Sequence, residues 1–141
     1  GKPAGKLAFS TDHRIEYAVG ELLKSLLFTD EARLHGPVVG MSGFAEEFAS
    51  QGVKDKKGRS LREFDLKQRL FRYPCSYLIY SEAFDNIPQP ALDRLYRRLW
   101  QVLTWRTKEP AFATLSEADR AAILEILRET KKGLPSYFFT N

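Results

Sequence analysis

Cysteine is almost absent from this sequence, which holds only Cys75. One thiol cannot form a disulfide within the chain, and a structural zinc site built on several cysteines is excluded. No stretch approaches the roughly 18 consecutive apolar residues of a membrane-spanning helix. The sequence also lacks a P-loop, a Gly-x-Gly-x-x-Gly motif and a Gly-x-Ser-x-Gly motif. We therefore predict no catalytic residues and no cofactor, and we favour a protein that is not an enzyme.

Histidine is nearly as scarce, with His13 and His35 far apart in the sequence. The two could form a metal site together with Asp12 or Glu31. Neither histidine has a second ligand at helical spacing, however, and isolated histidines near loops are commonly plain surface residues. We therefore predict no metal site.

Apolar residues are plentiful enough for a core. The chain has 141 residues, of which 43% are hydrophobic. This composition excludes a wholly disordered or collagen-like protein, and the length suits one domain rather than two. We expect residues 1–141 to form a single helical domain that belongs to a longer chain, since the first residue is Gly1 rather than methionine.

Periodic apolar residues predict an all-α fold, a compact bundle of five or six short helices. Three segments show the clearest amphipathic pattern and should support the bundle: 12–28, 89–104 and 116–130. In the first, Ser10, Thr11 and Asp12 are candidate caps. The expected inner face of that first helix consists of Ile15, Val19, Leu22, Leu23, Leu26 and Leu27. Gly20 within it indicates close packing against a neighbour.

The remaining segments give weaker patterns. We expect an irregular lead-in over 1–9, a short helix over 42–51 ended by a left-handed Gly52, and a helix starting near Leu61 behind the capping box Ser60-x-x-Glu63. Residues 75–84 are apolar almost all round, so they predict either a central buried helix, which we favour, or a short buried strand. The aromatic tail, 133–141, should pack on the core.

Positive charge gathers in two stretches. Residues 54–72 carry eight basic and three acidic groups, and a second basic stretch covers 93–108. Such stretches could bind phosphate or an acidic partner, or they could be a solvated loop and a helix face with ion pairs. The candidate anion-binding side chains are Lys54, Lys56, Lys57, Arg59, Arg62, Arg94, Arg97 and Arg98.

Cys75 and the tyrosines are the other candidates for chemistry. A cysteine nucleophile needs a base, and only the two histidines offer one, so we interpret Cys75 as a small buried apolar residue. Four tyrosines could line a pocket, but core and rim positions suit them better. These are Tyr73, Tyr77, Tyr80 and Tyr96.

Two segments resemble known families. The runs 41–46, 58–62 and 72–81 resemble the C-terminal region of uncharacterised bacterial proteins, which implies export, with the periplasm as one destination, and no established activity. The run Leu115–Arg128 is similar to the closing helix of class I cytochromes c. The haem motif Cys-x-x-Cys-His of that family is absent here, and Met41 precedes Cys75 instead of following it.

Three functional hypotheses follow. The leading one is a non-enzymatic helical interaction or accessory module of a larger bacterial protein, whose partner is another domain or protein. The second is binding of nucleic acid or another anionic partner through residues 54–72 and 94–98. The third, implied by the cytochrome resemblance, is a degenerate domain without covalent haem that uses Met41, His35 or His13.

Overall fold

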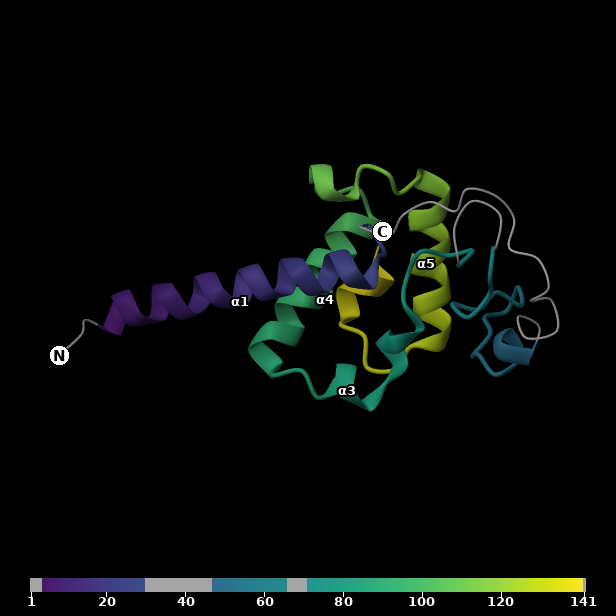
Figure 1. The fold of residues 1–141 in the computed structure, drawn as a ribbon, viewed down its shortest axis with the longest axis horizontal. Coiled ribbons are helices and arrows are strands. Elements are labelled where there is room, and N and C mark those ends of the chain that lie inside the picture. The colour runs from purple at the N-terminus through teal and green to yellow at the C-terminus, as the bar shows by residue number, and fades with distance from the viewer. Residues whose placement is uncertain (1–3, 30–46, 66–70, 141) are drawn as a thin grey trace.

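The computed structural model describes residues 4–29, 47–65 and 71–140, with side chains described from Thr11 onward. These residues form an all-α fold of packed helices, as predicted, and contain no strand apart from one isolated bridge. Figure 1 shows α1 crossing α4, with α5 beside them. The elements are α1 (Ala4–Leu26), η1 (Tyr77–Tyr80), α3 (Glu82–Asp85), α4 (Gln89–Leu103), η2 (Pro110–Phe112), α5 (Glu117–Thr130) and η3 (Ser136–Phe139).

Helix α1 is longer than predicted. It begins at Ala4, inside the segment expected to be an irregular lead-in, and it ends at Leu26 rather than at residue 28. Serine and threonine favour caps but also occur inside helices, so the residues at 10–12 did not mark the start. The first turns of α1 extend well beyond the rest of the molecule (Figure 1). Its buried face is Val19, Leu23 and Leu26, and Leu27 just after the helix is also buried. Leu22 is 43% exposed, so the prediction that it belongs to the inner face is wrong.

The end of α1 places a bulky residue where glycine is usual. Phe28 has a φ of 55°, and the Thr29 N–H donates to the Lys24 carbonyl over 3.1 Å, which closes the helix. A left-handed conformation is unfavourable for a residue with a side chain. The ring of Phe28 stacks on Phe71 at 5.5 Å, and this contact offsets part of the cost.

Helices α4 and α5 form where the sequence predicts them. In α4, Pro90 occupies the first turn and the buried stripe includes Leu92, Leu95 and Leu99. The Ser116 hydroxyl accepts a hydrogen bond of 3.0 Å from the Asp119 N–H and so caps α5. Helix α5 ends at Thr130 because Lys131 is already extended, and Gly133 follows with a φ of 82°.

The helix predicted to start near Leu61 does not form over 61–65, the part of it before residues that the structure leaves undescribed. The Ser60 N–H does donate to the Glu63 carboxylate, at 2.9 Å, but the Ser60 hydroxyl accepts from the N–H of Arg62 instead of capping a helix. Phe64 instead pairs with Phe71 in an antiparallel bridge. The capping-box pattern was therefore misleading, because its Ser60–Glu63 bond forms although residues 61–65 are not helical.

Gly52 does not end a helix in the predicted left-handed conformation, which Gly58 and Gly133 adopt among the described glycines. Within the expected helix 42–51, residues 47–50 are helical and 42–46 lie outside the described residues. Gly52 meets a different requirement, since a Cβ atom there would overlap the hydroxyl oxygen of Ser60.

Residues 75–84 form two short helical turns, η1 and α3, rather than one central helix, and the alternative strand is not present. Serines interrupt the run: the Ser76 hydroxyl accepts from the Leu78 N–H, and the Ser81 hydroxyl accepts from the Phe84 N–H. Ile79 and Phe84 are buried, but Leu78 is 57% exposed. This segment therefore belongs half to the core and half to the surface.

The aromatic tail packs on the core as expected. Phe138 is fully buried and its ring meets Tyr96 edge-on, with centroids 5.8 Å apart. Tyr137 contacts Trp100 in the same manner at 5.1 Å. Through η3 the tail therefore covers α4 and α5, although Phe139 stays exposed.

Candidate functional site

The most distinctive surface feature is an apolar groove between α1, η1, α3 and α4. It encloses about 440 Å³. Its lining residues are Leu22, Ser25, Leu26, Ser76, Leu78, Ser81, Ala83, Phe84, Ile87 and Leu95. No charged side chain is among them. The hydroxyls of Ser76 and Ser81 are engaged with backbone groups, so the groove presents almost only carbon to its contents.

An uncharged stripe on α1 leads into this groove. Its positions are spaced by four and three residues in alternation, which is the seam pattern of a coiled coil. The stripe comprises Thr11, Ile15, Ala18, Leu22 and Ser25. All are exposed except Ile15, which is half-buried. At a rise of about 1.5 Å per residue the stripe is about 21 Å long.

The groove and the stripe can do little acid–base chemistry, because neither contains an ionisable side chain. They can receive apolar side chains, above all from a helix lying along α1. The sequence pattern did not reveal this surface, because Leu22 and Leu78 both fall in apolar runs that predict burial. The alternating four-and-three spacing was the available signal.

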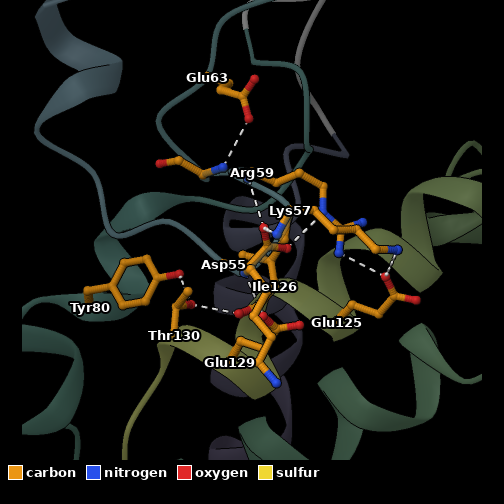
Figure 2. A network of polar contacts seen from close by, with 11 residues as sticks. Asp55, Lys57, Arg59, Glu63, Tyr80, Glu125, Ile126, Glu129 and Thr130 are labelled. Carbon is orange, nitrogen blue, oxygen red and sulfur yellow. Dashed lines mark hydrogen bonds and ion pairs between the residues drawn. The ribbon is translucent and has the colours of Figure 1, made fainter.

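Of the five predicted basic side chains in the loop, those of Lys57 and Arg59 are engaged within the molecule (Figure 2). The Arg59 guanidinium donates to the Asp55 carboxylate at 2.7 Å and to the Glu125 carboxylate at 2.8 Å. Lys57 reaches Glu125 at 3.5 Å, and the backbone N–H of Lys56 donates to a further α5 carboxylate, at Glu129. These contacts hold the loop against α5.

The pKa values of two carboxyl groups in this network are lowered by their contacts with Arg59. Burial raises the pKa of Asp55, but hydrogen bonds from the backbone and side chain of Arg59 outweigh burial and hold the pKa below its usual 3.8. The hydrogen bond from Arg59 likewise lowers the pKa of Glu125. Both carboxylates therefore stay ionised, and most of the positive charge of Arg59 is compensated.

The arginines of α4 are also engaged, mostly with α1. Arg94 pairs with Asp12. Arg98 donates to Glu109 at 2.8 Å and lies 3.1 Å from the Cβ position of Gly20, so the close packing expected at that glycine is present. Arg97 is the exposed member of the three and lies over the Tyr137 ring at 5.2 Å.

The two predicted basic groups lie in different parts of the molecule. Figure 1 shows the segment 47–65 on one side of α5 and the helices α1 and α4 on the other. Residues 54–62 and 94–98 therefore do not form one continuous surface. Lys54 and Arg72 are exposed, and Lys67 and Arg69 lie outside the described residues. The hypothesis of a basic binding surface stays a prediction, and it now concerns separate patches.

Arg62 is held by two aromatic rings rather than by a carboxylate. It has no salt bridge or side-chain hydrogen bond to any residue that the structure describes. Its guanidinium carbon lies 4.5 Å from the Phe48 ring centre and 4.8 Å from that of Tyr77. The aromatic rings fix this cation without neutralising it.

Cys75 is fully buried, and burial raises the pKa of its thiol to about 12. This agrees with the interpretation of Cys75 as a structural residue. Within residues 11–29, 47–65 and 71–140, no cluster of His, Cys, Asp and Glu has the arrangement of a metal site. No helix in the described part of the chain is both long and apolar enough to span a membrane.

Tyr73 and Tyr96 are buried and Tyr77 and Tyr80 are half-buried, which agrees with core and rim positions. The haem-related hypothesis depends largely on Met41 and His35, which lie outside the described residues, so it stays a prediction. Comparisons with protein-family models, with curated proteins and with solved structures found no significant match to this chain.

Proposed function

We propose that this protein is a non-enzymatic helical interaction module that binds a helix along α1 and in the adjoining groove. The groove is the observation that carries this proposal, because it combines about 440 Å³ of space with a lining that has no charge. Leu22 and Leu78 stand exposed at its edges. Helix-in-groove recognition uses such surfaces, with apolar anchors at successive helical turns.

The occupant that fits best is α1 of a second copy. The first turns of α1 extend beyond the rest of the molecule (Figure 1). In the sequence, the stripe spacing continues to Ala8 and Ala4. If two α1 helices pack antiparallel about Ile15, the extended turns of each lie beside Leu22 of the other. A pairing of this kind has two-fold symmetry and closes on itself.

Sedimentation equilibrium tests this proposal over about 5–500 μM protein, the range in which a modest dimer dissociates. We expect the wild type to dimerise, and we expect Leu22→Glu and Leu78→Glu each to raise the dissociation constant at least about tenfold, since a charge would then be buried at the interface. Val53→Glu is the matched control, because Val53 is 51% exposed but lies outside the groove.

Two results would contradict self-association. One is a wild type that stays monomeric throughout the range, and the other is an equal loss of dimer in Val53→Glu. Binding of the apolar dye anilinonaphthalene sulfonate tests the groove separately. If the dye binds the wild type and the Leu78→Glu variant equally well, then the groove is not an apolar binding surface and the wider proposal fails.

A further inference from the structure

A second, smaller pocket lies between the loop 51–62 and η1, and other residues of η1 line it than line the groove. Its volume is about 110 Å³, a quarter of that of the groove. Its lining residues are Gln51, Gly52, Val53, Ser60, Arg62, Tyr77 and Tyr80. Unlike the groove, this pocket is lined mainly by polar side chains.

Hydrogen-bond donors around this pocket lack acceptors among the described residues. Arg62 offers five guanidinium N–H groups and none of them is bonded to those residues. Tyr77 makes no hydrogen bond through its hydroxyl within the same part of the chain. Ser60 is buried, and its hydroxyl accepts from the Arg62 N–H at 3.1 Å without donating its own proton to any of these residues.

The hydroxyl of Tyr80 has the opposite role. Thr130 donates its hydroxyl proton to the Ile126 carbonyl at 2.7 Å, so the Tyr80 hydroxyl, 2.6 Å from Thr130, must donate to it (Figure 2). This leaves the Tyr80 oxygen as an acceptor at the pocket. The surroundings therefore offer several donors and one acceptor.

Charge and backbone shape favour the same kind of ligand. The Asp55 carboxylate is engaged with Arg59, and the Glu63 carboxylate accepts from the Ser60 N–H. The positive charge of Arg62 therefore has no carboxylate partner among the residues that the structure describes. Gly52 keeps the pocket walls close to one another, because a Cβ atom there would overlap Ser60 and crowd the Arg62 stem.

We propose that Arg62, Tyr77 and Ser60 form a binding pocket for a phosphate group. The forked guanidinium suits two oxygens of a tetrahedral oxyanion, and the two hydroxyls supply the further donors that a phosphate dianion accepts. The Tyr80 oxygen can accept from a protonated phosphate. The small volume fits a terminal or free phosphate better than a phosphodiester within a nucleic-acid strand.

Isothermal titration of the whole chain with inorganic phosphate, at constant ionic strength, tests this site. We expect one phosphate per chain with a dissociation constant between about 0.1 and 5 mM. Arg62→Lys keeps the charge but removes the fork, and it should weaken binding about tenfold. Arg106→Gln is the control, because Arg106 stacks on Trp100 at 4.3 Å in the same manner, away from this pocket.

Three further measurements test the phosphate site independently of the Arg62→Lys variant. Should Arg62→Lys fail to fold, amide NMR of the wild type replaces it, and phosphate should then shift the signals of Gly52 and Ser60. No binding up to about 20 mM phosphate would overturn the proposal, and so would an equal loss in Arg106→Gln. Phenyl phosphate should bind at least as well as inorganic phosphate. An oligothymidine without terminal phosphate that binds through Arg62 where inorganic phosphate does not would assign the site to nucleic acid instead.

Discussion

Replacement of Arg120 by methionine should destabilise the protein more than any loss of a surface charge. Arg120 is only 2% exposed and donates to three backbone carbonyls, those of Val102, Phe112 and Leu115, at 2.6–3.1 Å. Its guanidinium also lies 3.6 Å from the Trp105 ring centre. The side chain therefore joins the end of α4, η2 and the start of α5.

The magnitude depends on which carbonyls lose their only partner. The carbonyls of Val102 and Phe112 each accept another backbone N–H, from Trp105 and Leu115 respectively, whereas the Leu115 carbonyl has no second partner among the described residues. An unsatisfied buried carbonyl costs about 1–3 kcal/mol. Loss of the stacking on Trp105 adds about 1–2 kcal/mol. Because methionine avoids burying a charge, we expect a net loss of about 2–4 kcal/mol.

Urea unfolding followed by tryptophan fluorescence measures this loss. Arg106→Met is the matched control, because Arg106 stacks on Trp100 from an exposed position. It should cost less than about 1 kcal/mol. If Arg120→Met lowers the free energy of unfolding by less than about 0.5 kcal/mol, or no more than the control does, the carbonyl contacts do not stabilise the fold and the reasoning is wrong.

Two further predictions concern titratable groups. Because the pKa of Asp55 is lower when folded, its contribution to stability is complete above the unfolded value of 3.8 and is lost as the pH falls through the folded value. Asp55→Asn should therefore cost about 1–3 kcal/mol at pH 7 and flatten the acid limb of a stability–pH curve; an unchanged acid limb would contradict this. Cys75, with its pKa of about 12 against 9.0, should react with iodoacetamide about a thousandfold more slowly at pH 8 in the folded protein than in urea, and equal rates would show that the thiol is accessible.

Local sequence patterns determined the helices whose signals agree with one another. In α4 the apolar stripe agrees with the first-turn proline, and in α5 the apolar stripe agrees with the capping serine. No long-range contact has to override them, so the all-α class and both helices could be predicted. The buried thiol of Cys75 was predicted for a similar reason, because apolar residues surround it in the sequence.

Tertiary structure decided what local signals could not. The capping box at Ser60 formed one of its bonds without a helix, and Phe64 pairs with Phe71 instead. The exposure of Leu22 and Leu78 depends on which elements lie beside them, and the spacing of apolar residues in the sequence does not predict those neighbours. Segments distant in sequence likewise supply partners to several cations: Arg59 and Arg94 pair with carboxylates on α5 and α1, whereas Arg62 stacks on two rings. Helical periodicity is a local property of the chain, whereas the groove, the network on α5 and the pocket at Arg62 depend on how distant segments pack.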